Sequence, residues 1–296
     1  MEQHRIRANG LNFNVWRAGS GGQPLLLLHG WPEFAAVWHK VMDRLADRFT
    51  LIAPDLRGFG DSDKPDPGPS DKAGADVHAA DMLAVLETLG IGKCGIVAHD
   101  VGAYVSQSIA RSHPESVAGL FYFDCPYPGI GARGAAPDHL KEIWYQYFHQ
   151  QPWAAEMVGA SRETCRLYFS HFLSHWSARK DAFDNDIEAW VDNFLKPGNM
   201  QGGFNWYISN NASRLAMLRG DAPAPTPITV PTCCRWGEAG SVLPSAWGDR
   251  MGEFFTNVDF KPLPGVGHFP HWEDPDLASA EIAKFFGKLA DEAWKS

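Results

Sequence analysis

Residues 97–102 read Val97-Ala98-His99-Asp100-Val101-Gly102 and join an apolar stretch to a stretch with helical spacing. Small residues around a central side chain permit a tight strand-to-helix turn that projects this side chain out of a sheet. Asp100 occupies the projecting position, where an esterase would carry serine. A carboxylate that attacks saturated carbon forms an ester with its substrate, so the turn predicts cleavage of a carbon–oxygen or carbon–halogen bond. Aspartate before a helix is also a common N-cap, and the turn alone leaves both interpretations open.

Short apolar runs alternate with helix-like stretches on both sides of this turn. Strands interleaved with helices of this length predict an α/β fold with a mostly parallel sheet covered on both faces. The expected strands are Pro24–Leu28, Thr50–Ala53, Cys94–Ala98 and Val117–Phe123, and the expected helices are Phe34–Arg48 and Ala75–Leu89.

The pattern changes in the second half of the chain. From about Pro126 to Gly220 it is helical and aromatic, and three prolines between residues 223 and 227 then break the run. We therefore predict an α/β core, residues 1–128 and 221–296, interrupted by a helical cap, residues 129–220. Cap helices are expected at Ile143–Gln150, Arg162–His171 and Ile187–Leu195, followed by core strands at Thr232–Trp236 and Val258–Pro262 and a helix at Leu277–Leu289.

The composition argues against several classes of function. A net charge of −9, without runs of lysine or arginine, disfavours a protein that binds the nucleic-acid backbone. The longest aliphatic run, Leu25–Leu28, is far too short to cross a bilayer, and residues 1–10 lack the apolar core of a secretory signal. Five cysteines at irregular positions predict free thiols in a reducing cytoplasm, with Cys94 and Cys233 as small core residues.

Two further motifs add chemistry to the turn at Asp100. His29-Gly30-Trp31-Pro32 follows the first apolar strand, where a turn can aim the Trp31 backbone N–H at the nucleophile beside the N–H of Val101. Such a pair of donors would form an oxyanion hole. Gly265-Val266-Gly267-His268-Phe269 surrounds a histidine with glycines, which suits a positioned general base. Each motif alone could be an ordinary turn, but all three in this order predict a nucleophile followed by its base.

With these motifs the chain resembles the epoxide hydrolase and dehalogenase branch of the α/β-hydrolase superfamily, most closely its epoxide hydrolases. The resemblance covers almost the whole length and rests on residues 29–32, Asp55–Ser62, His99–Gly102 and Gly267-His268. It implies an α/β-hydrolase fold with an inserted helical cap, Asp100 as the nucleophile and His268 as the base.

The acid of the triad is expected in one of two places. Many relatives carry an aspartate where this sequence has Gly240. Others, including fluoroacetate dehalogenases, place the acid one strand earlier, which corresponds here to Asp124. An acid there could accept the second imidazole N–H and stabilise the imidazolium that forms. We predict Asp124, with Glu238 as the alternative; a turn residue at the strand end is the competing explanation of Asp124.

In this branch the cap determines the leaving group. An epoxide oxygen needs a donor as the ring opens, which a pair of tyrosine hydroxyls supplies, whereas a halide needs donors such as tryptophan N–H groups. Trp144–Pro152 resembles the first cap motif of epoxide hydrolases and Gly203–Tyr207 the second, which implies Tyr145 and Tyr207 as donors. Tyr147 replaces Tyr145 if the register differs by two, and aromatic packing in the cap is the alternative explanation of both tyrosines.

Fluoroacetate dehalogenases would carry His-Trp where this chain has Tyr145-Gln146, and two arginines where it has Val101 and Tyr104. Their carboxylate clamp is therefore missing. The resemblance also implies substrate contacts next to the motifs, from His29, Pro32, His99, Gln146 and Phe269.

The predicted function is hydrolysis of a small-molecule epoxide to a vicinal diol through a covalent aspartyl ester. We expect no metal or organic cofactor, no nucleic-acid or membrane partner, and by family analogy a homodimer. The alternatives are a fluoroacetate- or haloalkane-type dehalogenase with the same nucleophile, or a non-catalytic relative that serves as a binding module. An intact nucleophile, oxyanion turn and base argue against the last, because a binding protein does not need all three.

Overall fold

A computed structural model describes residues 1–65 and 74–295. Its centre is an eight-stranded sheet in the order β1-β2-β4-β3-β5-β6-β7-β8. The two strands β1 and β2 form an antiparallel hairpin at one edge, β2 pairs antiparallel with β4, and the remaining neighbours are parallel. The strands are β1 (Glu2–Ala8), β2 (Leu11–Ala18), β3 (Pro24–Leu28), β4 (Thr50–Pro54), β5 (Cys94–His99), β6 (Val117–Phe123), β7 (Thr232–Gly237) and β8 (Val258–Leu263).

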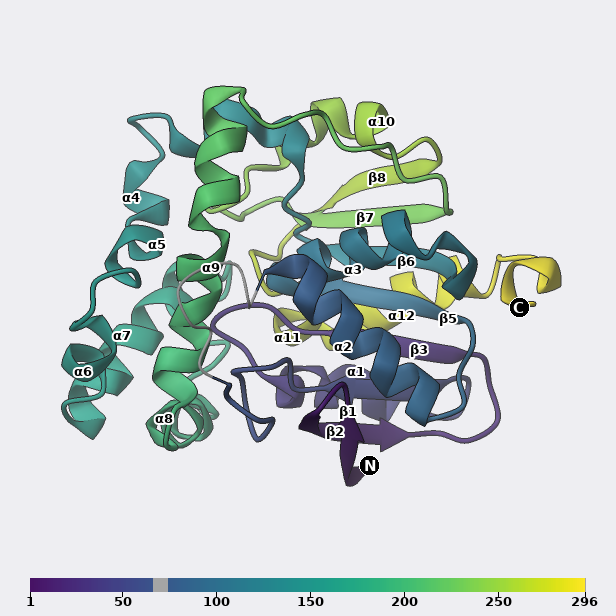
Figure 1. The fold of residues 1–296 in the computed structure, drawn as a ribbon, viewed down its shortest axis with the longest axis horizontal. Helices are drawn as coiled ribbons and strands as arrows, with labels where there is room; N and C mark the ends of the chain where they lie inside the picture. Colours follow the sequence, from purple (N-terminus) through teal and green to yellow (C-terminus); the bar gives the residue numbers. More distant parts are fainter. Residues whose placement is uncertain (66–73, 296) are drawn as a thin grey trace.

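Helices cover both faces of this sheet and form a separate group beside it (Figure 1). Helices α2 and α3 pack together on one face, whereas α1, α11 and α12 pack on the other. The helices are α1 (His39–Leu45), α2 (Ala75–Thr88), α3 (Val101–Ser112), α4 (Leu140–Ile143), α5 (Tyr145–Phe148), α6 (Ala154–Val158), α7 (Arg162–His175), α8 (Ile187–Leu195), α9 (Asn199–Arg219), α10 (Met251–Phe254), α11 (Pro270–Glu273) and α12 (Pro275–Phe286). Short 3-10 helices lie at Ala35–Trp38, Pro114–Ser116, Pro128–Ala135, Ser245–Arg250 and Asp291–Trp294.

The helices α4 to α9 lie to one side of the sheet, at the ends of its parallel strands, and α9 crosses the front of this group (Figure 1). They come from the stretch that the sequence predicts to be a cap. The boundaries expected at residues 128 and 220 stay predictions.

The mostly parallel sheet is as predicted, but some elements differ. The single helix expected over Phe34–Arg48 is a 3-10 helix followed by a shorter α1. At the start of the 3-10 helix, the Ala35 N–H donates to Asp55 Oδ1 at 2.7 Å and ties this turn to the end of β4. The helix expected over Ile143–Gln150 is likewise divided into α4 and α5.

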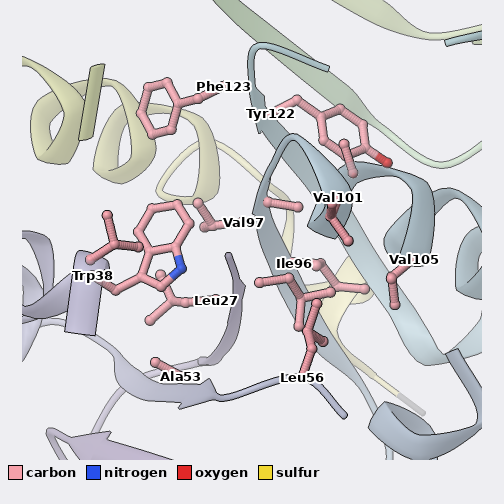
Figure 2. Close-up of a cluster of buried hydrophobic side chains, with 14 of the residues drawn as sticks. Leu27, Trp38, Ala53, Leu56, Ile96, Val97, Val101, Val105, Tyr122 and Phe123 are labelled. Atoms are coloured by element: carbon pink, nitrogen blue, oxygen red, sulfur yellow. The ribbon is translucent and has the colours of Figure 1, made fainter. Parts of the chain in front are cut away.

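The central strands are buried on both faces because helices cover them. Leu25, Leu26, Leu27 and Leu28 of β3 are fully buried, as are all six residues of β5. Figure 2 shows how Leu27 and Val97 from adjacent strands meet Trp38 on one face, while Val105 of α3 lies on the other. This core fixes the ends of β3 and β5, from which the loops of the site emerge.

Among the described residues, no helix combines the length and the apolar character needed to cross a bilayer.

Candidate active site

The site lies where the strand order reverses. The chain passes from β3 to β4 on one side and then to β5 on the other, so the loops after β3 and β5 diverge at the carboxyl ends of adjacent strands. Such a switch point opens a crevice in parallel α/β sheets. Trp31 lies in the loop after β3, and Asp100 directly follows β5.

Asp100 has the backbone of a sharp strand-to-helix turn. Its φ is +46° and its ψ is −110°, which is uncommon for a residue other than glycine and concentrates at functional sites. Its side chain makes no capping hydrogen bond to α3, although it stands at the N-cap position. The N-cap interpretation therefore does not account for this aspartate.

The Asp100 carboxylate meets the loop after β3. The Trp31 N–H donates to Asp100 Oδ1 at 3.0 Å. A Cβ atom at Gly30 would lie 2.5 Å from the Asp100 Cβ, so glycine at this position permits the approach. Val101 is the first residue of α3, where backbone N–H groups have no partner within the helix. Of the two predicted oxyanion donors, the Trp31 N–H thus contacts the Asp100 carboxylate, and Val101 directly follows Asp100 at the start of α3.

His268 and Asp124 form a buried pair, and His268 is close enough to Asp100 to feel its charge. Asp124 Oδ2 lies 2.8 Å from His268 Nδ1, and the Gly237 N–H donates to Asp124 Oδ1 at 2.8 Å. Burial lowers the pKa of His268, and the nearby His99 lowers it further. Burial also raises the pKa of Asp124. His268 is therefore neutral at rest, as a general base must be.

The alternative acid, Glu238, is exposed at the end of β7. A Cβ atom at Gly240 would lie 3.5 Å from Asp124 Oδ2, so the position that carries an aspartate in many relatives is beside the Asp124 carboxylate. The geometry favours Asp124 as the acid.

Two tyrosines from the predicted cap meet close to Asp100. Tyr145 of α5 is only 3% exposed and stacks on Trp31, with ring centroids 4.8 Å apart. The Tyr145 and Tyr207 rings are in edge-to-face contact, with their centroids 5.4 Å apart. Burial, and then the charge of Asp100, raises the pKa of Tyr145. Burial, and then Tyr145 and Asp100, raise the pKa of Tyr207. Both hydroxyls are therefore protonated donors at neutral pH. Tyr147 is 41% exposed, which favours Tyr145 in the choice between them.

A cavity reaches these groups from the side of α9. Asp100, Tyr145 and Gln146 line a space of about 110 Å³. A second cavity of about 500 Å³ shares Gln146 with the first and is lined by Tyr207. The Gln146 Nε2 donates to the Tyr145 hydroxyl at 3.3 Å, so this predicted substrate contact lies at the site.

The other four predicted substrate contacts are interior residues. His29 is fully buried, with Nδ1 donating to the Gly30 carbonyl and Nε2 accepting from the Leu56 N–H. Pro32 is buried, and its carbonyl accepts from the indole N–H of Trp190. His99 and Phe269 are fully buried as well. All four lie outside the linings of the two cavities described, as do Trp31 and His268, so their roles as substrate contacts stay predictions.

Glu33 is a site residue that the sequence analysis missed. Its carboxylate contacts His99 Nδ1 and His271 Nε2, both at 2.8 Å, and accepts from the Gly30 N–H at 2.6 Å. Burial opposes the charge on His99, but Glu33 raises its pKa to about 9. Burial likewise opposes the charge on Glu33, but His99 and His271 hold its pKa well below the usual value. The result is a buried ion pair directly beneath the Gly30 loop and the His268 ring. Its only sequence signal was a glutamate directly after the His-Gly-Trp-Pro motif.

Glu33, His99 and His271 also have ligand atoms within 4.8 Å of one another, a spacing that could hold a metal ion. Each Glu33 oxygen already contacts an imidazole nitrogen, however. A hydrogen-bonded network accounts for the cluster.

Residues 23–275 match the model of a protein family described as the alpha/beta hydrolase fold. The chain belongs to this family. The hydrolase is 33% identical over 297 residues to the soluble epoxide hydrolase of Corynebacterium sp. (strain C12), with 97% of each chain covered. It is 29% identical to a fluoroacetate dehalogenase of Burkholderia sp., covering 90% of this chain and 88% of that protein.

Among solved structures, the hydrolase is similar to the epoxide hydrolase CorEH without ligand. The TM-score is 0.82 at 30% identity, with 98% of this chain and 99% of the other covered. The match to the family model and these relatives confirm the predicted α/β-hydrolase fold and the branch of epoxide hydrolases and dehalogenases.

Proposed function

We propose that this hydrolase converts an epoxide to a vicinal diol through an ester on Asp100. The observation that carries the proposal is the pair of tyrosines from the cap, which are in edge-to-face contact and both close enough to Asp100 for its charge to raise their pKa values. An arrangement of one carboxylate opposite two neutral hydroxyl donors suits a reaction in which a carbon is attacked while the oxygen leaving it is protonated.

In the first step an Asp100 oxygen attacks an epoxide carbon from the side opposite the ring oxygen. The carbon–oxygen bond of the ring breaks, and the oxygen takes a proton from Tyr145 or Tyr207. The product of this step is a hydroxyalkyl ester of Asp100. Gln146 supports the donors by its hydrogen bond to the Tyr145 hydroxyl.

In the second step His268 takes a proton from water, which attacks the ester carbonyl. Asp124 stabilises the imidazolium, to which it is joined at 2.8 Å. The N–H groups of Trp31 and Val101 stabilise the tetrahedral oxyanion. Collapse breaks the ester bond and releases the diol, the imidazolium proton goes to the departing oxygen, and the second proton of the water restores the tyrosine. The net reaction adds one water to the epoxide.

Dehalogenation is the second candidate. It is favoured by the fluoroacetate dehalogenase among the relatives and by the position of the acid at Asp124. The same nucleophile and base would serve it, with a halide as the leaving group. Tyrosine hydroxyls over the nucleophile favour an oxygen leaving group, and we place epoxide hydrolysis first for this reason.

Intact-protein mass of the His268→Gln variant tests both candidates. Without the base, the Asp100 ester should accumulate. An added mass equal to a whole epoxide, absent when Asp100→Ser is also present, is the expected result. An added mass equal to a haloacid minus hydrogen halide would instead make the protein a dehalogenase. If neither reagent class adds mass while the wild type forms diol, the reaction does not pass through an ester on Asp100.

A further inference from the structure

Arg214 is a cation in the substrate cavities that neither step of the proposed mechanism uses. It lies on α9, and it lines both the cavity that contains Asp100 and the larger cavity next to it. Among the residues that the structure describes, no carboxylate lies within ion-pair distance of its guanidinium. Its Nη1 atom is shielded from solvent and has no hydrogen-bond partner.

An aromatic ring contacts this cation. The guanidinium carbon lies 4.7 Å from the centroid of the Tyr147 ring. Stacking on an aromatic face uses the face of a guanidinium and leaves the N–H donors at its edge free. Two N–H groups at such an edge match the geometry of a carboxylate. Arg214 is thus a cation held against a ring at the wall of the cavities, and its Nη1 donor has no partner.

Asp76 is the other charged residue that lines the larger cavity. It accepts a hydrogen bond from the Ser108 hydroxyl at 2.5 Å. No ion pair joins it to Arg214 within the described part of the chain. Its charge faces the same cavity, so a bound anion is expected on the Arg214 side, away from Asp76.

We propose that Arg214 binds a carboxylate of the substrate, so that the preferred substrates are epoxides carrying a carboxylic acid. This inference rests on the proposed function, whose substrate class it narrows. The same helix carries Tyr207, which would hold the epoxide oxygen. Seven residues of helix separate Tyr207 and Arg214, which is two turns or roughly 10 Å. The acid is therefore separated from the epoxide by a chain of several carbons rather than attached to the ring.

The apolar and polar parts of the larger cavity fit such a molecule. Trp206 and Met217 offer apolar surface for the carbon chain of the substrate. Asn210 and Ser213 add polar side chains to the same cavity, from the helix that carries Arg214. A long-chain epoxide without a charged end would leave the Arg214 donors unpaired in the complex, which disfavours its binding relative to the acid.

The binding test uses decanoate and decanamide, which differ in charge but not in chain length and need no catalysis. Calorimetric titration of the wild type should show decanoate bound roughly 10- to 100-fold more tightly, because hydrogen bonds to a charged group exceed neutral ones. Arg214→Gln should reduce this ratio to about one, and Arg214→Lys should retain part of it. The matched control is Arg219→Gln, which removes an exposed cation from the last turn of the same helix and should keep the full ratio.

Circular dichroism of each variant shows whether it is folded. Equal affinities of the wild type for the two ligands, absence of decanoate binding, or a preference that survives in folded Arg214→Gln would overturn the inference.

The turnover test uses 9,10-epoxydecanoate and 9,10-epoxydecanamide. In the wild type kcat/KM should favour the acid by a similar ratio, mainly through KM, and Arg214→Gln should lose that preference. If decanoate binding depends on Arg214 but neither epoxide yields a diol, the carboxylate site stands and epoxide hydrolysis is wrong. If both epoxides are hydrolysed at equal kcat/KM, epoxide hydrolysis stands and the role of Arg214 is wrong.

Discussion

The Asp124 Oδ2 atom lies 2.8 Å from the Nδ1 atom of His268, although 144 positions separate the two residues in the sequence. The second oxygen of the same carboxylate accepts the Gly237 N–H, so the end of β7 holds Asp124 in the orientation that His268 requires. Asp124 itself has a φ of +39°, and this uncommon backbone turns the residue away from the path of β6.

Asp124→Asn should reduce kcat for diol formation by roughly 100- to 10,000-fold, because the imidazolium of the second step loses its counter-charge. The ester on Asp100 should then accumulate and be visible as added mass. Glu238→Gln is the control and should leave kcat unchanged, since Glu238 is exposed. A fall in kcat in the control equal to that in Asp124→Asn would assign the acid to Glu238.

Gly240 offers a second test of the same geometry. A Cβ atom there would lie 3.5 Å from the Asp124 Oδ2 position, and the Gly240 backbone is not in the left-handed region. We expect Gly240→Asp to restore part of the activity that Asp124→Ala loses. The kcat of the double variant should exceed that of Asp124→Ala by roughly 10-fold or more. The measurement is kcat of the double variant against Asp124→Ala alone, and no recovery would show that position 240 cannot reach the imidazole.

The paired tyrosines should act in the first step only. Tyr145→Phe and Tyr207→Phe should each slow epoxide opening by roughly 10-fold or more, and the double variant by roughly 100- to 10,000-fold, since an acid in a transition state contributes that much. The ester should not accumulate in these variants during single-turnover mass measurements. Tyr122→Phe is the matched control, because its hydroxyl contacts Ser106 in the interior. Accumulation of ester in the cap variants would place the tyrosines in the second step instead.

The acid limb of the kcat profile should lie below the usual range for histidine. His268 must be neutral to accept a proton, and burial, together with His99, lowers its pKa below the ordinary 6.5, although the charge of Asp100 opposes this lowering. As the pH falls through 6.5, an ordinary histidine would become protonated and activity would fall, whereas His268 should stay neutral and active. Measuring kcat from pH 4 to pH 8 checks this. An acid limb centred near pH 6.5 would show that burial does not lower the pKa of the base.

The sequence predicted the parts of the site that follow local rules. Asp100, His268 and the Trp31 turn were found because small residues and glycines mark tight turns at strand ends. The hairpin of β1 and β2 was missed because its strands carry many polar residues and lack an apolar run, although Asn9-Gly10, with φ values of +45° and +77°, is a typical signal for a tight hairpin turn.

Glu33 and Arg214 were missed for a different reason. A buried glutamate is recognisable only by its partners, and the His271 that binds it lies 238 positions away. Arg214 is one of two arginines on a long helix, and only the packing of α9 against the core places it, rather than Arg219, in the cavities. Long-range contacts of this kind leave no local pattern in the sequence.

The contact between Gly58 and Gly202 positions the helix that carries Tyr207. A Cβ atom at Gly202 would lie 2.0 Å from the Gly58 carbonyl oxygen, so the backbone of α9 rests directly on the backbone of the loop after β4. Gly202→Ala must push the two apart. We expect a loss of about 1 to 3 kcal/mol in the free energy of unfolding, measured in urea, as for other overpacked sites.

The same substitution should lower kcat, because Tyr207 follows five residues later on the same helix and a shift of about 1 Å at a reacting group can cost roughly 100-fold. Gly252→Ala is the control, since a Cβ atom there meets nothing within 4 Å. If Gly202→Ala acts through Tyr207, combining it with Tyr207→Phe should lower kcat by less than the product of the two single effects. Effects that multiply in full would show that the glycine contact influences the reaction by another route, and an unchanged kcat would show that α9 tolerates the displacement.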